Sequence, residues 1–243
     1  NIWKNAGEIA GNNIDDDNNG LIDDVHGWNF VSEIANLSDL NGHGTQVAGV
    51  AAADTDNDLG IAGTCWGCRL MAVKVMSDGG VANYSDIAQG VVYAAQKGAK
   101  VINISLGGYS YSSTLLAAIQ AAVNDYGAVV VAGAGNDDTD APFYPAAYDE
   151  VIAVAGTDED DLKASFSDYG TWVDLTAPAV AIYTTFSGGG YGAVDGSASW
   201  VSWILPGERS CTSPPVFPLS RLRWSSGRAR GMASLPWSRI ISL

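Results

Sequence analysis

The sequence predicts an α/β fold in three layers, in which a doubly wound parallel sheet carries helices on both faces. Short apolar runs typical of buried strands alternate with segments that place apolar residues at helical spacing. The runs are largely apolar, which indicates parallel strands that are buried on both sides. The composition fits a compact chain, because 47% of the 243 residues are hydrophobic, 16% are charged and 29 are glycines.

Four apolar runs are the predicted strands, and two segments between them are the predicted helices. The strands cover residues 70–76, 101–105, 128–132 and 151–155. The first helix has Ser85 as its N-cap, an apolar face of Ile87, Val91 and Ala94, and Gly98 beyond its end. The second helix has the apolar face Leu115, Ala118, Ile119 and Val123, with Gly127 beyond its end. In such sheets the active groups collect at the carboxyl ends of the strands.

The charge composition changes near residue 200. Residues 1–199 carry 6 basic and 26 acidic side chains, whereas residues 200–243 carry six arginines and Glu208. The second segment holds four of the eight tryptophans and five of the eight prolines, and it matches neither helical nor strand spacing. We therefore expect a single domain over residues 1–199 and an aberrant, non-native tail over residues 200–243. The alternative is a basic arm for an acidic partner.

The net charge of −15 restricts the partners of the chain. It argues against nucleic-acid binding and against docking on anionic membranes, and it is compatible with bound cations. No apolar run reaches 18 residues, so we expect no transmembrane helix. The acidic, lysine-poor composition fits an extracellular or saline setting, and we expect a monomer.

One motif places His43 between two glycines at the start of a helix of small residues. The glycines let another chain approach the imidazole closely, and a neutral His at such a place is suited to act as a general base. Alone, such a His is more often structural or a metal ligand. Three further motifs accompany it: Ser-Leu-Gly-Gly at 105–108, Ala-Gly-Ala-Gly-Asn at 132–136, and Tyr-Gly-Ala-Val-Asp-Gly-Ser at 191–197.

Together these motifs resemble, in order and spacing, those of the subtilase family of serine proteases over residues 1–199. The segments at 5–17 and 24–28 are also similar to those of bacterial secreted subtilases. The resemblance implies a secreted serine endopeptidase that cleaves polypeptide substrates through an acyl-enzyme. It implies His43 as the general base and Asn136 as the donor to the oxyanion. It also implies that two segments flank the substrate strand: Ser105, Leu106, Gly107 and Ala132, Gly133, Ala134.

The sequence departs from the family at two places. The family's triad Asp lies on an early strand in an Asp-Thr-Gly-type turn, and no such motif precedes His43 in this sequence. Asp39, four residues before His43, lies in the family's loop before the His, and we do not assign it to the triad.

The family's nucleophile motif Gly-Thr-Ser-Met-Ala reads Gly-Ser-Ala-Ser-Trp at 196–200 here. An ungapped alignment puts Ala198 at the nucleophile position, a register with deletions gives Ser197, and a third register gives Ser199. We assign Ser197, the alternative being a chain without a functional nucleophile. We therefore expect a poor protease.

An acidic run at 15–24 predicts a calcium site. The candidate ligands are Asp15, Asp17, Asn19, Asp23 and Asp24. Oxygen ligands at alternating positions suit calcium, and Gly20 permits a sharp turn. The spacing resembles the first half of an EF-hand loop, but the twelfth position is His26, so the motif is a different one. The alternative is a solvated acidic loop.

Two cysteines three residues apart, Cys65 and Cys68, have three interpretations: a local disulfide, a redox pair or half of a zinc site. No second Cys pair or nearby His supports zinc, and we predict the disulfide. Cys211 lies in the tail. We expect His26 to be structural.

Three functions compete on this sequence. The first is a serine endopeptidase, and the second is a catalytically impaired remnant that acts at most as a calcium-stabilised scaffold for extended peptides. The third is a nucleotide-binding domain, suggested by Gly133-Ala-Gly135. That motif lacks the full Gly-x-Gly-x-x-Gly after a first strand, which disfavours this third function.

Overall fold

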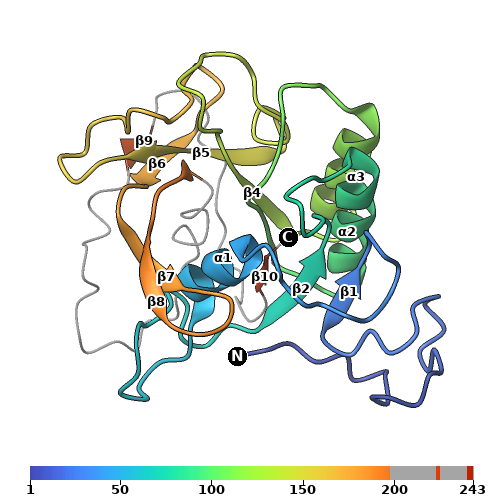
Figure 1. The fold of residues 1–243 in the computed structure, drawn as a ribbon. Helices are drawn as coiled ribbons and strands as arrows, with labels where there is room; N and C mark the ends of the chain where they lie inside the picture. The colour runs from blue at the N-terminus through green and yellow to red at the C-terminus, as the bar shows by residue number, and fades with distance from the viewer. Residues whose placement is uncertain (198–222, 225–239, 243) are drawn as a thin grey trace.

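The computed structural model describes residues 1–197, 223–224 and 240–242. Its main sheet has the strand order β1-β2-β10-β3-β4-β5-β6-β9, and neighbouring strands are parallel except for β6 and β9 (Figure 1). The strands are β1 Gly27–Asn29, β2 Leu70–Lys74, β3 Val101–Ile104, β4 Val129–Gly133, β5 Val151–Thr157, β6 Leu175–Pro178, β9 Arg223–Trp224 and β10 Ile240–Ser242. A separate antiparallel hairpin joins β7 Ile182–Thr185 to β8 Tyr191–Val194.

Helices cover both faces of the sheet, which confirms the three predicted layers. They are α1 His43–Ala52, α2 Tyr84–Gln96 and α3 Ser113–Asn124. On one face, α2 and α3 pack on alternate strand residues such as Ile102 and Ile104. On the other face, the end of α1 packs in a second core that contains Val101 and Val131 (Figure 1). Adjacent residues of β3 therefore enter opposite cores, as expected of a strand buried on both sides.

The four predicted strands are present as β2, β3, β4 and β5, with bounds that shift by at most two residues. Both predicted helices are also present, but the start of α2 was predicted wrongly. Its N-cap is Asn83, and Ser85 lies within the first turn, where its hydroxyl donates to Asp86. Both residues are good caps, so composition alone did not separate them. Gly98 and Gly127 follow the two helices with φ of 84° and 66°, a conformation that glycine adopts without strain.

The hairpin β7–β8 fixes the position of α1. The hydroxyl of Thr184 donates to the carbonyl of Gln46 at 2.6 Å, and the hydroxyl of Thr185 donates to the carbonyl of Thr45 at 2.8 Å. Gly49 brings the helix close to these threonines, because a Cβ at this position would overlap both hydroxyls. The hairpin therefore holds the helix whose first residue is His43.

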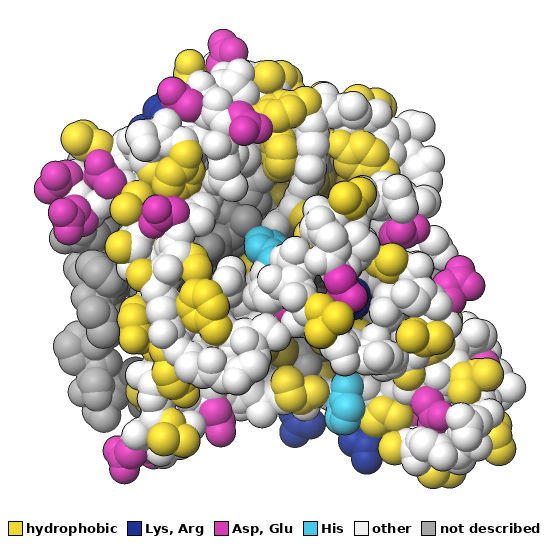
Figure 2. Space-filling view, in the orientation of Figure 1, with side chains coloured by type: hydrophobic (Ala, Val, Ile, Leu, Met, Phe, Trp, Pro, Cys, Tyr) yellow, Lys and Arg dark blue, Asp and Glu magenta, His cyan; other side chains and the backbone are white. Residues whose placement is uncertain are grey.

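Two short pieces of the segment 200–243 join the main sheet as β9 and β10, which the spacing of the sequence did not predict. Ala198, Ser199 and Cys211 lie outside the described residues. Within the described part of the chain, no helix has the length and apolarity that crossing a membrane requires. Acidic side chains are spread over the face in Figure 2, whereas Lys and Arg occupy few places on it.

The predicted disulfide between Cys65 and Cys68 is present, with both residues buried. His26 has a structural contact, because its Nδ1 lies 2.9 Å from the carbonyl oxygen of Trp3.

Candidate active site

The candidate site lies where β3 and β4 end. These strands pair in parallel up to Ile104 and Ala132, and the chain then continues into the two segments predicted to flank a substrate. Both segments therefore start from one edge of the sheet, side by side. His43 reaches the same edge from α1, because its ring contacts Ser105 directly after β3.

The start of α1 is fixed by a carboxylate from outside the helix. The N-cap Gly42 has φ of 91° and no side chain to cap with. Asp39 takes this role by accepting hydrogen bonds from the backbone of Gly42 and from the backbone and hydroxyl of Thr45, at 2.7–2.8 Å. Burial opposes ionisation of Asp39, but these hydrogen bonds outweigh it and lower the pKa of the carboxyl. Asp39 thus fixes the helix end that carries His43.

The imidazole of His43 is half-buried and hydrogen-bonded to the backbone. Its Nε2 lies 2.7 Å from the carbonyl oxygen of Ser105. A carbonyl oxygen only accepts, so Nε2 carries the proton in this arrangement. A protonated Nε2 accepts no further proton, so action as a base requires this contact to break. Among the described residues, no carboxylate is hydrogen-bonded to the His43 ring.

The segment after β3 is held in place by backbone hydrogen bonds to a residue that is distant in the sequence. Gly108 exchanges two backbone hydrogen bonds with Tyr144, at 2.9 and 2.8 Å. Gly107 is packed so closely that a Cβ would overlap the carbonyl of Tyr144 and the ring of Phe143. Ser105 is buried, and its hydroxyl accepts a hydrogen bond from the side chain of Asn103 at 2.9 Å.

The second flanking segment is fully buried. Ala132 and Gly133 pair with β5, and the amide of Ala134 donates to the carbonyl of Val154 at 2.8 Å. The pairing with β3 stops at Ala132. Among the described residues, the backbone edge of Gly133 and Ala134 that faces β3 therefore has no ladder pairing with β3.

Asn136 and Ser197 lie against each other across 61 residues of sequence. The backbone amide of Ser197 donates to Oδ1 of Asn136 at 2.9 Å, which leaves the amide NH₂ of this exposed residue as a donor. The hydroxyl of Ser197 is buried and is held by Gly135, accepting from its amide at 3.2 Å and donating to its carbonyl at 3.0 Å. Asn136 is thus placed to donate, whereas the Ser197 hydroxyl must leave Gly135 before it can react.

A polar network next to the contact between Asn136 and Ser197 was not predicted from the sequence. Asp168 is completely buried, and Oδ1 accepts from the amides of Asp137 and Thr139 at 2.9 and 3.1 Å. The hydroxyl of Tyr109 lies 2.7 Å from Oδ2 of Asp168 and 2.8 Å from Oδ2 of Asp137. Burial and these two carboxylates raise the pKa of Tyr109. The network ties the segment after β3 to the loop that carries Asn136.

An apolar cavity of ≈ 210 Å³ opens beside His43. Its wall includes Leu37, Ala48 and Leu106, together with the carboxylate-bearing Asp39. Leu106 belongs to the predicted substrate-flanking segment. The cavity is thus continuous with the candidate site and offers a largely apolar surface there.

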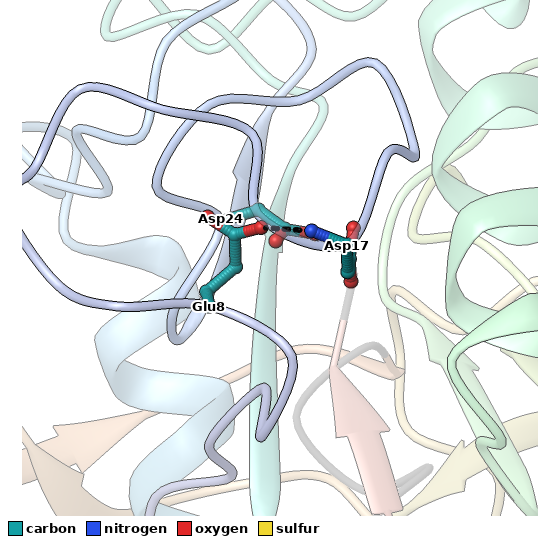
Figure 3. A group of neighbouring side chains, drawn as sticks. All are labelled: Glu8, Asp17 and Asp24. Carbon is teal, nitrogen blue, oxygen red and sulfur yellow. Dashed lines mark hydrogen bonds between the residues drawn. The ribbon is translucent and has the colours of Figure 1, made fainter.

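Three carboxylates gather in the N-terminal loop, and their oxygens lie within 4.8 Å of one another (Figure 3). They belong to Glu8, Asp17 and Asp24, and Asp24 is completely buried. Lys97 lies 2.5 Å from Oδ2 of Asp17 and 3.4 Å from Oδ2 of Asp24. Oδ1 of Asp17 is buried and has no hydrogen-bond partner in the described structure. Three carboxylates against one lysine leave negative charge and a free oxygen, and this donor set fits a divalent cation.

Only two of the five predicted calcium ligands, Asp17 and Asp24, belong to this cluster. Asp15 accepts from the amides of Asn19 and Gly20, and Asp23 accepts from those of Gly11 and Asn13. The side chain of Asn19 donates to Asp24 at 3.0 Å. Glu8 was missed, because it precedes the acidic run and carries no ligand spacing of its own.

The chain is similar to known proteases along most of its length. A family model described as the subtilase family matches residues 4–205. The thermophilic serine proteinase of Bacillus sp. (strain AK1) is 44% identical over 204 residues, which are 84% of this chain and 48% of that protein. Thermitase from Thermoactinomyces vulgaris is 47% identical over 205 residues, which are 84% of this chain and 69% of thermitase.

Two solved structures have a similar fold. A cold-adapted subtilisin-like serine proteinase matches with a TM-score of 0.66 and 33% identity, over 73% of this chain and 63% of that chain. A protease from Pseudoalteromonas arctica matches with a TM-score of 0.64 and 32% identity, over 67% of this chain and 56% of that chain. The chain therefore spans about half to two thirds of the length of most of these proteins.

Proposed function

The chain belongs to the subtilase family, and we propose that it is a serine endopeptidase that binds polypeptides in an extended conformation and hydrolyses them slowly. The observation that carries this proposal is the arrangement of the two flanking segments, His43 and Asn136 at one edge of the sheet. The peptidase domain in this proposal covers residues 1–199, and residues 200–243 are a non-native addition to it.

In the proposed reaction a serine hydroxyl attacks the carbonyl carbon of the scissile peptide bond and loses its proton to Nε2 of His43. The NH₂ of Asn136 donates to the oxyanion that forms on the carbonyl oxygen. His43 then gives the proton to the leaving amine, and the acyl-enzyme is hydrolysed by water. Ser105–Gly107 and Ala132–Ala134 would bind the substrate backbone on its two sides. We propose Ser197 as the nucleophile.

A second candidate, a peptide-binding scaffold without turnover, is favoured by three hydrogen bonds. Nε2 of His43 donates to Ser105, and the hydroxyl of Ser197 is held on both sides by Gly135. In this state neither group is available for acyl transfer. Peptide binding would persist, because it uses backbone groups of the flanking segments.

A fluorophosphonate probe and a chromogenic peptide separate these functions. The peptidase is expected to label once per chain and to turn over slowly, and both signals should vanish in His43→Ala. Ser197→Ala and Ser199→Ala, tested side by side, identify the labelled hydroxyl. Peptide binding with no label in any variant would replace the peptidase by the scaffold. Absence of both binding and label would reject both functions.

We further propose a structural calcium ion held by Glu8, Asp17 and Asp24, with Asp15, Asn19 and Asp23 shaping the loop. Calcium binding to the native state alone would stabilise it by about 2.7 kcal/mol at a hundredfold excess over Kd. Thermal melting with calcium and with chelator should therefore differ, and Asp17→Asn should abolish the difference. The matched control is the exposed Asp160→Asn. If calcium raises the melting temperature of Asp17→Asn as much as that of the unaltered chain, the ion is bound elsewhere.

The proposed setting is extracellular, and the proposed working form is a monomer. The Cys65–Cys68 disulfide supports an oxidising compartment. The net charge of −15 supports a soluble protein that avoids nucleic acid and anionic membranes.

A further inference from the structure

The loop that carries Asn136 is held by a single residue on both sides of that asparagine. The carbonyl of Gly135, directly before Asn136, accepts a hydrogen bond from the backbone amide of Asp168 at 3.1 Å. The backbone amide of Asp137, directly after Asn136, donates to Oδ1 of Asp168 at 2.9 Å. Asp168 is 0% exposed, so these hydrogen bonds form in a shielded environment. The position of Asn136 therefore depends on the position of Asp168.

Tyr109 reaches the same carboxylate from the segment that follows β3. It lies two residues after Gly107, the last residue of the segment proposed to bind the substrate on that side. Its hydroxyl lies 2.7 Å from Oδ2 of Asp168 and 2.8 Å from Oδ2 of Asp137. A phenol has one hydrogen and donates to one of these oxygens at a time. Either acceptor connects the segment of Tyr109 to the loop of Asn136.

The ring of Tyr109 is fixed in a direction that points its hydroxyl at this loop. It packs edge to face on Phe143, with ring centroids 5.1 Å apart and the ring planes at 74°. Phe143 itself lies against both segments, because a Cβ on Gly107 would be 2.5 Å from its Cε1 and a Cβ on Gly135 would be 3.2 Å from its Cδ2. Tyr109 is thus well placed to span the two segments, although it is 42% exposed.

In the proposed reaction, the substrate and the oxyanion donor are held by different segments. The substrate backbone lies along residues 105–107, whereas the donated NH₂ comes from Asn136 after the end of β4. Such a donor must lie about 2.7–3.1 Å from the oxyanion, and a misplacement of about 1 Å can reduce the rate by about 10². A side chain that spans the two segments therefore sets the distance on which donation depends.

We propose that Tyr109 is a positioning residue for Asn136, whose hydroxyl holds the Asn136 loop at a fixed distance from the substrate bound along residues 105–107. This inference rests on the proposed function. Tyr109 acts through Asp168 and Asp137 and does not touch the reacting atoms.

Loss of the hydroxyl alone leaves the backbone contacts of the substrate-binding segments in place. Gly108 keeps its two hydrogen bonds to Tyr144, and the amide of Ala134 stays bonded to β5. Peptide binding is therefore expected to persist in Tyr109→Phe. Acyl transfer is expected to slow, because the NH₂ of Asn136 is no longer held at the oxyanion.

The test is a double-mutant cycle between Tyr109→Phe and Asn136→Ala, with the rate of fluorophosphonate labelling as the readout. Tyr109→Phe should label about tenfold more slowly, which is part of the factor of about 10²–10³ that removal of an oxyanion donor costs. In Asn136→Ala the same substitution should change the rate by less than about twofold, because no donor is left to position. The matched control is Tyr111→Phe, on the same segment and 58% exposed, which should label at the unaltered rate.

Peptide affinity separates positioning from a general structural role. The Kd of a chromogenic peptide, measured in the His43→Ala background so that the peptide is not cleaved, should differ by less than about twofold between Tyr109 and Tyr109→Phe. A loss of affinity as large as the loss of labelling rate would overturn the proposal. An unchanged labelling rate in Tyr109→Phe, or an equal slowing with and without Asn136, would overturn it too.

A measurement without turnover keeps this inference separate from the proposed function. If the unaltered chain is not labelled, the proposed peptidase fails, and the position of Asn136 is then read by nuclear magnetic resonance. The signal of its side-chain NH₂, assigned by its loss in Asn136→Ala, should shift in Tyr109→Phe and not in Tyr111→Phe. A signal that stays in place in Tyr109→Phe, or that shifts equally in both variants, would show that Tyr109 does not position Asn136.

Discussion

Replacement of Asp168 tests whether a single buried carboxylate holds the loop that carries Asn136. Asp168 is 0% exposed and receives hydrogen bonds from two backbone amides and from the Tyr109 hydroxyl. In Asp168→Ala these three donors lose their acceptor together. A buried donor left without its acceptor costs about 1–3 kcal/mol, so three such donors lead us to expect a loss of about 3–5 kcal/mol in the free energy of unfolding.

Asp168→Asn separates charge from shape. The amide oxygen still accepts from the backbone of Asp137 and Thr139, while its NH₂ faces the Tyr109 hydroxyl in place of a carboxylate oxygen. One charge-assisted hydrogen bond is lost, so we expect a cost of about 1–2 kcal/mol. The exposed Asp160→Asn is the matched control, with an expected change within about 0.5 kcal/mol.

Urea unfolding and thermal melting measure both variants. A change of 1 kcal/mol shifts Tm by about 2–4 °C for a chain of this size, so Asp168→Ala should melt about 10 °C lower and Asp168→Asn a few degrees lower. If Asp168→Ala lies within about 1 kcal/mol of the unaltered chain, the network does not hold the loop. A peptide-binding loss in Asp168→Ala that exceeds the loss in Asp168→Asn would link the network to the site.

Three further outcomes follow from the described contacts. Gly135→Ala should cost about 3 kcal/mol or more in urea unfolding, because Gly135 has φ of 114° and a Cβ there would overlap Asp168; an unchanged midpoint would contradict this. The pKa of Asp39 is lower in the folded than in the unfolded chain, so the ionised carboxylate stabilises the fold fully above about pH 4. This stabilisation is lost as the pH falls through the pKa of the folded state. In Asp39→Asn, the free energy of unfolding should therefore depend less on pH in the acid range. Tyr93→Phe removes the hydroxyl that donates to buried Asp24 at 2.8 Å and should lower the free energy of unfolding by about 1–3 kcal/mol, whereas a neutral result would mean that water replaces the phenol.

The sheet could be predicted where its strands are long enough to carry a pattern. Residues 128–132 and 151–155 are continuous apolar runs, and the strands they predict, β4 and β5, are present. β10 has only three residues and its neighbours are more than 130 residues away in sequence, so no local pattern indicates its position. Short strands of this kind are fixed by the partners that surround them and not by their own composition.

The candidate site likewise has residues that the sequence indicated and contacts that it did not. His43 and Asn136 were singled out because both lie in glycine-rich motifs, and their roles were predicted from the resemblance of these motifs to the subtilase family. The contact between Tyr109 and Asp168 joins residues 59 apart, and Glu8 meets Asp24 only after the loop has folded. Such polar contacts depend on tertiary placement, and a single sequence carries no periodic signal for them. The acidic run at 15–24 gave the location of the carboxylate cluster but not its membership.

If the proposed mechanism holds, the hydrogen bonds at the candidate site indicate which defect would limit catalysis. With Ser197 as the proposed nucleophile, His43 would have to release the Ser105 carbonyl and Ser197 would have to release Gly135 before a proton could pass between them. Each neutral hydrogen bond is worth about 1 kcal/mol net, so the two rearrangements together reduce the rate by roughly 30-fold. Replacing the triad Asp by Asn in a well-studied serine protease reduces turnover by about 10⁴. Among the described residues no carboxylate is hydrogen-bonded to the His43 ring, so in the proposed mechanism the unsupported imidazolium would be the larger obstacle. A carboxylate supplied next to His43 would therefore restore more activity than any substitution that only frees the Ser197 hydroxyl.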